Sequence, residues 1–301
     1  MPVISKNEKE LLRKVLYGIV AVFAVLLLVG TFCDFQLTSA LYVQDQALAQ
    51  LISAVGLQPL APPLCILLGA LVQRHLAGSR SIIFKVLICI ALVLAGCYSF
   101  AEMMKSFLSY DGIGPLLPFE VSKDVSRGLG AILGLVLMVV GYRSALKNDD
   151  EKLMQRLVVT VLLLVGVFIF SEIIKGFMHR PRHRTIVLGY EGIEFQPWYL
   201  PFHGHKELTE MYQLSSDAFK SFPSGHCIQT GAAVISFYGL AALYPALRSK
   251  WGVATVVFIA LVLCVPISRL VLGAHYLSDV AVGIVLSALA GIYLLGREDL
   301  S

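Results

Sequence analysis

Long apolar runs alternate with shorter polar connections along the chain. Eight of these runs are long enough to cross a bilayer as helices, for which about 20 apolar residues are needed. The second run is marginal, because Pro59, Pro62 and Pro63 shorten its start. The predicted spans are residues 14–35, 58–74, 82–103, 127–143, 155–176, 225–245, 251–270 and 277–296. The pattern predicts an all-α, polytopic membrane helix bundle.

Two segments depart from this alternation. Residues 37–57 have helical spacing with polar interruptions, which predicts an amphipathic helix lying at the membrane interface. Residues 177–222 form the longest polar segment and are rich in His, Arg, Pro and aromatic residues. A segment of this length is more than a connection between two spans, so we expect it to have a function.

Composition agrees with a membrane protein. The chain has 301 residues, of which 57% are hydrophobic and 15% charged, and its mean hydropathy is +0.78. Soluble domains carry more charge and less apolar mass. The formal net charge of +4 does not indicate a nucleic-acid partner. The six cysteines lie mostly in apolar runs without metal-ligand spacing, so we interpret them as small hydrophobic residues.

Basic residues predict the orientation. Four of them precede the first apolar run, which is long enough to span and has no following A-x-A-like site, so we expect an uncleaved first span. With the N-terminus in the cytoplasm, most other Lys and Arg residues fall in cytoplasmic connections, as the positive-inside rule requires. The 177–222 segment then lies outside the cell, where a basic cluster is an exception to the rule. That cluster consists of Lys175, Arg180, Arg182 and Arg184.

Several polar residues lie where spans end or begin on this outer side. The fifth span ends in "SEIIKGFMHRPRHR", the sixth begins at "FPSGH", and "SRLVLGAHYLSD" joins the seventh to the eighth. Ionisable residues at membrane depth are costly, so each is a candidate functional residue. Singly, Lys175 would be interpreted as an interfacial anchor and Glu172 as its helical partner. The combined set indicates a site, and comprises Lys175, Arg182, Ser224, His226, Arg269, His275 and Asp279.

The chemistry of this set suits a phosphate group. Arginine forks match phosphate oxygens in bidentate fashion, and lysine adds positive charge. Ser224 is a good N-cap for the sixth span, and Gly225 allows the backbone to approach a ligand. Backbone amides at the start of a helix form an anion site. We therefore expect Lys175, Arg182, Ser224, Gly225 and Arg269 to bind phosphate.

Two histidines and an aspartate are the predicted catalytic residues. His275 and Asp279 are four residues apart, so on a helix the carboxylate could hold one imidazole nitrogen and leave the other free as a nucleophile. His226 could protonate the leaving alkoxide. The expected reaction is attack by His275 on phosphorus, followed by hydrolysis of a phosphohistidine.

These residues resemble the three motif blocks of the type 2 phosphatidic acid phosphatase family, the membrane branch of a superfamily shared with vanadium haloperoxidases. Lys175 and Arg182 have the spacing of the first block, Pro223 to His226 read "PSGH", and Ser268 to Asp279 supply the third. The resemblance covers 171–296. It implies a six-helix core with about two additional spans, hydrolysis without a metal or other cofactor, and His275 as the nucleophile. It divides the chain into N-terminal spans over 1–153 and a phosphatase core over 154–301.

One position departs from the family pattern. His183 follows Arg182 where the family usually has proline, whereas Arg180–Pro181 lies only five residues after Lys175. Either Arg182 binds the phosphate or the register shifts to Arg180. We prefer Arg182 because it keeps the spacing from Lys175, and we then expect Arg180 and Arg184 at the rim, where they would contact the lipid headgroup or a second phosphate.

Three classes of function stay open. The first is a phosphatase acting on a lipid phosphate at the outer face of a bacterial cell membrane, with phosphatidic acid, phosphatidylglycerophosphate or undecaprenyl diphosphate as substrate. The second is a haloperoxidase-like enzyme, or a phosphatase of small soluble phosphate esters, that uses the same anion site. The third is an inactive relative that binds phospholipid, which is disfavoured because His226, His275 and Asp279 are all present. The extra arginines favour a diphosphate.

Overall fold

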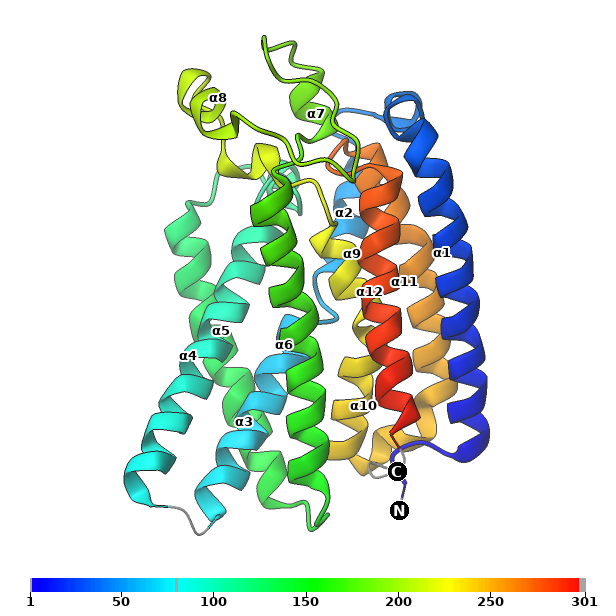
Figure 1. Ribbon diagram of the computed structural model, residues 1–301. Coiled ribbons are helices and arrows are strands. Elements are labelled where there is room, and N and C mark those ends of the chain that lie inside the picture. Colours follow the sequence, from blue (N-terminus) through cyan, green and yellow to red (C-terminus); the bar gives the residue numbers. More distant parts are fainter. Residues whose placement is uncertain (1, 79–80, 298–301) are drawn as a thin grey trace.

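The computed structural model describes residues 2–78 and 81–297, and these residues form a bundle of helices without a β-strand (Figure 1). The prediction of an all-α membrane bundle is therefore confirmed. The α-helices are α1 (Lys6–Leu41), α2 (Ala47–Gly56), α3 (Ala61–Ala77), α4 (Ile82–Phe107), α5 (Lys123–Leu146), α6 (Leu153–Met178), α7 (His183–Ile186), α8 (His205–Met211), α9 (Gly225–Gly231), α10 (Ala233–Leu243), α11 (Trp251–Val271) and α12 (Leu277–Gly296). Three short 3-10 helices are η1 (Gly114–Leu116), η2 (Ser216–Phe219) and η3 (Pro245–Lys250).

Within the described residues, seven helical stretches are long and apolar enough to cross a membrane. An eighth span exists if α9 and α10 count as one, although the two are bent by 41°. The predicted span 225–245 is thus a broken helix. At the break, Gly231 packs so closely on α12 that a Cβ there would lie 2.6 Å from the Cβ of Ser287. Ser287 also donates a hydrogen bond from Oγ to the carbonyl of Ile228, at 2.8 Å.

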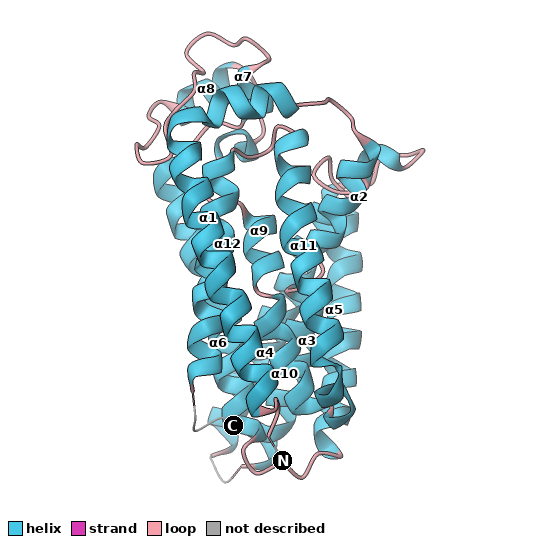
Figure 2. Ribbon diagram, turned by 90° about the vertical axis from the view of Figure 1, so that its right-hand side faces the viewer, coloured by secondary structure: helices cyan, strands magenta, loops and turns pink. Residues whose placement is uncertain are grey.

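The broken span places the start of α9 inside the bundle rather than at its surface. Helix α9 packs against α12, α11 and α6, and Figure 2 shows it behind and between α11 and α12. Every α9 residue from His226 to Gly231 is buried. A polar helix N-terminus in this position is enclosed by three other helices.

Residues 37–57 differ from the interfacial helix that the sequence predicts. Residues 37–41 belong to α1 and residues 47–56 form α2, which packs against α11 and α9. The polar residues Gln50 and Ser53 are buried, and Ser53 accepts a hydrogen bond from Arg269. The polar face that suggested contact with water therefore faces a polar site within the protein.

Helices α3, α4 and α5 form one side of the bundle, on which α4 and α5 are the outer pair (Figure 1). Glycines allow the backbones of α3 and α5 to touch: a Cβ on Gly69 would lie 1.9 Å from the carbonyl oxygen of Met138, and one on Gly141 would lie 1.8 Å from that of Ile66. Small residues at such contacts are typical of helix packing in membranes. The large apolar side chains that α4 and α5 leave exposed would face lipid.

The two ends of the bundle differ. The start of α1 and the end of α12 lie at one end, whereas α7, α8 and the long segment after α6 cover the other (Figure 1). Helix α1 packs along α12, so the first span is in direct contact with the predicted phosphatase core. The expected domain boundary at residue 153 coincides with the start of α6 and remains a prediction.

Candidate functional site

Backbone hydrogen bonds join the three motif blocks at the end of the bundle away from the termini. The segment after α6 threads between the residues that precede α9 and those that join α11 to α12. Three backbone hydrogen bonds of 2.9 to 3.0 Å hold it there: Arg182 to Ala218, Ser221 to Arg180, and Arg184 to Gly273. A fourth, from the Ser224 amide to the carbonyl of Asp279 at 3.0 Å, joins the start of α9 to α12. Residues separated by up to about a hundred positions are thus brought into one site.

The start of α9 has the features expected of an anion cradle. Ser224 occupies the N-cap position, as predicted, but its side chain makes no capping hydrogen bond. Its Oγ is buried without a hydrogen-bond partner. Gly225 faces Lys175, since a Cβ on Gly225 would lie 2.9 Å from the lysine Nζ. The Lys175 ammonium also forms an ion pair of 2.6 Å with Glu172, the partner that the sequence indicates.

Three arginines converge on the carboxylate of Asp111, which lies in the connection between α4 and α5. Arg182 Nη1 is 2.8 Å from Oδ2, and Arg269 Nη2 is 2.8 Å from Oδ1. Arg184 binds both oxygens, at 2.8 and 3.3 Å. The Nε atoms of Arg182 and Arg269 are buried without a partner. Arg184 therefore belongs to this arginine cluster rather than to a separate headgroup rim.

His275 is oriented by a backbone carbonyl. Its Nδ1 lies 2.5 Å from the carbonyl oxygen of Ser221, whereas the nearest oxygen of Asp279 is 3.8 Å away. The expected direct hydrogen bond from His275 to Asp279 is therefore absent. Because a carbonyl only accepts, we infer that Nδ1 carries the hydrogen and that Nε2 of the neutral ring has a free lone pair.

The surroundings of His275 favour its neutral form. Burial lowers the pKa of His275 well below its ordinary value, and the nearby charges of Arg269, Arg182 and Lys175 act in the same direction. Asp111 opposes this effect. The second histidine, His226, is also buried, and its Nε2 has no hydrogen-bond partner. A neutral imidazole beside several cations is chemically suited to attack on a phosphate group.

Arg180 does not lie at a rim. It is fully buried, and its guanidinium binds Asp279 at 2.5 Å and Asp34 of α1 at 2.9 Å. It also stacks over the ring of Tyr276, 4.2 Å from the ring centroid. The expectation that Arg180 contacts a headgroup does not hold, because its polar atoms are already used inside the protein. Of the two arginines between which the sequence left a choice, only Arg182 lies in the arginine cluster.

Asp279 links several parts of the site. It accepts hydrogen bonds from the Ser221 hydroxyl at 2.5 Å and from the backbone amide of Tyr276 at 2.8 Å, in addition to Arg180. Ser221 is the residue whose carbonyl orients His275. Asp279 therefore acts on His275 through Ser221 and the start of α12.

Two residues that bind the arginines of the site, Asp34 and Asp111, were not predicted from the sequence. Asp34 is the only acidic residue between Glu10 and Asp45 and interrupts the apolar run of α1. An ionisable residue within a span is a functional candidate by default, so this signal was present. Asp111 lies between the predicted spans 82–103 and 127–143, and nothing in its local sequence relates it to the arginines.

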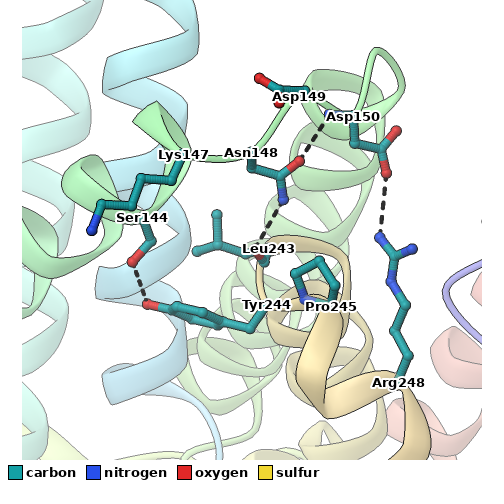
Figure 3. A pocket seen from close by; sticks show the side chains of 9 residues that line it. All are labelled: Ser144, Lys147, Asn148, Asp149, Asp150, Leu243, Tyr244, Pro245 and Arg248. Atoms are coloured by element: carbon teal, nitrogen blue, oxygen red, sulfur yellow. Dashed lines mark hydrogen bonds and ion pairs between the residues drawn. The ribbon is translucent and has the colours of Figure 1, made fainter.

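A cavity of about 470 Å³ lies at the other end of the bundle, near the connection between α5 and α6 (Figure 3). Its lining includes Lys147, Asn148, Tyr244 and Arg248, and the picture shows Asn148 and Tyr244 directed to neighbouring groups. None of the predicted site residues lines it. This cavity is therefore separate from the motif blocks.

Comparisons with known proteins agree with the motif blocks. Residues 156–297 match the family model described as the PAP2 superfamily. Two curated relatives, each described as "Lipid A 1-phosphatase", are from Rhizobium johnstonii, 37% identical over 90 residues and 30% of this chain, and from Rhizobium etli, 37% identical over 86 residues and 29% of this chain. The aligned stretch spans 28% of the length of each relative. No solved structure gives a match. The chain therefore carries, over residues 156–297, a domain of the PAP2 superfamily, the superfamily of the type 2 phosphatidic acid phosphatases.

Proposed function

We propose that this protein is a lipid phosphatase that hydrolyses a phosphomonoester or diphosphate at the extracytoplasmic face of the membrane. The observation that carries the proposal is the hydrogen bond from His275 Nδ1 to the Ser221 carbonyl, beside the arginine cluster. It presents Nε2 as a nucleophile next to groups that bind phosphate oxygens. The PAP2 domain supports the same reaction class.

The proposed reaction has two steps. Nε2 of His275 attacks phosphorus, the bond from phosphorus to the lipid oxygen breaks, and His226 donates a proton to the leaving oxygen. Water then attacks the phosphohistidine, His226 takes up a proton, and inorganic phosphate leaves. Arg182, Arg269 and Lys175 would stabilise the charge on the phosphoryl oxygens, together with the Ser224 hydroxyl and the amides at the start of α9. No metal takes part in these steps.

The substrate class follows from the position of the site. The arginine cluster lies where helices end, so a lipid could enter sideways from the bilayer with its phosphate at that level. Phosphatidic acid, phosphatidylglycerophosphate and undecaprenyl diphosphate fit this description. Lipid A with a phosphate at position 1 is a further candidate substrate, because the two curated relatives are each described as a lipid A 1-phosphatase. Arg184 beside Arg182 favours a diphosphate, because it adds a further cation to the cluster.

The experiment is phosphate release by the purified protein in detergent with EDTA. The panel contains phosphatidic acid, phosphatidylglycerophosphate, undecaprenyl diphosphate, lipid A and glucose 6-phosphate, with His275→Ala beside the wild type. We expect release from at least one lipid and loss of more than about 1,000-fold in the variant, since a nucleophile cannot be replaced by alanine. Release that EDTA abolishes would contradict the mechanism.

Two other outcomes would point to the alternative functions. Turnover of glucose 6-phosphate as fast as any lipid would indicate a phosphatase of small soluble esters. No release from any substrate by folded protein would indicate a phospholipid-binding relative without activity. Orientation is tested separately, by labelling single cysteines placed in 177–222 with a reagent that does not cross the membrane of intact cells, and we expect labelling.

A further inference from the structure

Asp111 occupies the position that a phosphate group would need. Its carboxylate lies between Arg182 and Arg269, which are both motif residues, and it uses the same guanidinium nitrogens that would bind phosphoryl oxygens. Arg184 donates a further hydrogen bond to the same carboxylate. A carboxylate held by several arginines has the bidentate geometry that a phosphate also takes.

We propose that Asp111 is a displaceable internal anion that sets the affinity of the phosphate subsite, so that a substrate must replace its carboxylate between Arg182 and Arg269. The proposal rests on the proposed function for the identity of the substrate, but it concerns the binding of any phosphate group. Asp111 then sets the affinity of the subsite and takes no part in the chemistry.

The charges of the cluster favour exchange. Three guanidinium groups face one carboxylate, so the cluster keeps an excess of positive charge with Asp111 in place. A terminal phosphate carries a charge of about −1.5 to −2 at neutral pH, whereas a carboxylate carries −1. Replacing Asp111 by a phosphate therefore neutralises the cluster more completely.

The backbone of Asp111 is anchored independently of its side chain. Its carbonyl oxygen accepts a hydrogen bond of 2.7 Å from Ser53 and one of 3.3 Å from Arg269. Its amide donates to the hydroxyl of Ser109 at 3.2 Å. The carboxylate can thus leave the arginines by rotation of the side chain while the turn stays in place.

Buried polar atoms around the cluster indicate that its hydrogen bonding is incomplete with Asp111 alone. Ser224 Oγ, His226 Nε2 and the Nε atoms of Arg182 and Arg269 are buried without partners. Buried polar groups without partners are rare in proteins and call for an explanation. A phosphate has more acceptor oxygens than a carboxylate, so it could satisfy groups that Asp111 does not reach.

Competition from Asp111 would lower the fraction of sites that the abundant lipids of the membrane occupy. It weakens the binding of every anion by the same factor. Anions whose intrinsic affinity for the arginine cluster is low would then no longer occupy the site to a significant extent. Phosphodiester headgroups carry a single negative charge on phosphorus and would be excluded, while terminal phosphates would still bind. Without Asp111, diesters in large excess would occupy the site.

The test is calorimetric titration of the purified full chain in detergent with inorganic phosphate, and separately with diethyl phosphate. We expect Asp111→Asn to bind inorganic phosphate at least tenfold more tightly than wild type, and to bind diethyl phosphate where the wild type shows no heat. Asp124→Asn removes a charge from an exposed residue in the first turn of α5, and we expect it to bind as the wild type does. Arg182→Ala should bind neither ligand.

A second variant guards against misfolding. Asp111→Asn leaves three arginines without their carboxylate, so Asp111→Glu provides a charged control that we expect to bind phosphate within threefold of wild type. Phosphate should also raise the unfolding temperature of Asp111→Asn more than that of wild type. Folded Asp111→Asn with equal or weaker phosphate affinity would overturn the proposal. If no lipid is hydrolysed but phosphate binds more tightly to Asp111→Asn, the inference stands and the proposed function fails.

Discussion

The ring of His275 is held by the carbonyl oxygen of Ser221, 2.5 Å from Nδ1, and the hydroxyl of the same Ser221 donates to Asp279 at 2.5 Å. The aspartate four residues after the histidine therefore acts on it indirectly. A carboxylate in direct contact with the ring would stabilise the imidazolium through its negative charge. A backbone carbonyl is neutral, so it fixes the tautomer of His275 without strongly favouring the protonated ring. This relationship fits a histidine that has to be neutral when it attacks.

The first prediction concerns the stability that Asp279 provides. Asp279→Ala removes one of the two carboxylates that bind buried Arg180 and the acceptor of the Tyr276 amide. It leaves Ser221 Oγ with only the long hydrogen bond of 3.4 Å to the carbonyl of Ala274. Breaking a buried ion pair by removing one partner costs about 3–5 kcal/mol in the free energy of unfolding. We expect Asp279→Ala to unfold in detergent at a clearly lower temperature than His275→Ala. Equal unfolding temperatures would contradict this assignment of Asp279.

The second prediction concerns pH. His275 has a pKa well below its ordinary value of 6.5, mainly because of burial, so it stays neutral in the folded protein as the pH falls through 6.5. The nucleophile is lost only when the pH falls through the lower, folded pKa. We expect the acidic limb of kcat/KM to have its midpoint below pH 6.5.

The substrate phosphate also titrates in this range, so the profile should be measured with a phosphomonoester and with a diphosphate. An acidic limb with the same midpoint for both substrates reports the titration of a group on the enzyme rather than on the substrate. A common midpoint at or above pH 6.5 would show that His275 is not the neutral nucleophile described above. The free energy of unfolding should also decrease as the pH drops below 6.5. In the unfolded chain His275 takes up a proton near pH 6.5, whereas in the folded protein it stays neutral, so acid favours the unfolded state.

The third prediction separates Arg184 from Arg180. Arg184 lies in the arginine cluster, so Arg184→Ala should reduce kcat/KM for undecaprenyl diphosphate about tenfold more than for undecaprenyl phosphate, if it binds the second phosphate. Arg180→Lys loses the fork that joins Asp34 and Asp279, and should lower the unfolding temperature without such a preference. Equal losses on both lipids for Arg184→Ala would rule out a diphosphate role.

The sequence predicted the helical bundle and the order of the motif blocks because both are local signals. Apolar length identifies a span directly, and Lys175, Arg182, His226 and His275 lie at fixed spacings within their own segments. The bend between α9 and α10 was not predictable in this way. It depends on the contact of Gly231 with Ser287 of another helix, which hydropathy does not record.

The partners of the arginines could not be predicted for a similar reason. Arg180 and Arg182 are two residues apart in the same basic stretch, yet one is fully buried between Asp34 and Asp279 and the other binds Asp111. Each partner comes from a distant part of the chain, including spans outside the motif blocks. Spacing from Lys175 favoured Arg182, but only the folded arrangement explains what Arg180 does.

The last prediction uses the contact between Gly225 and Lys175. A Cβ at position 225 would lie 2.9 Å from the lysine Nζ, so Gly225→Ala must push the ammonium away from the start of α9. Because Nζ is the free end of a long side chain, the fold should tolerate this shift while the phosphate subsite loses a cation in its place. Gly166→Ala is the matched control on α6, since a Cβ there meets no atom within 4 Å. We expect Gly225→Ala to lower kcat/KM about tenfold with an unfolding temperature close to wild type, as for the loss of one charge-assisted hydrogen bond of about 1.5–3 kcal/mol. Full activity in Gly225→Ala would mean that Lys175 does not bind the phosphate from beside Gly225.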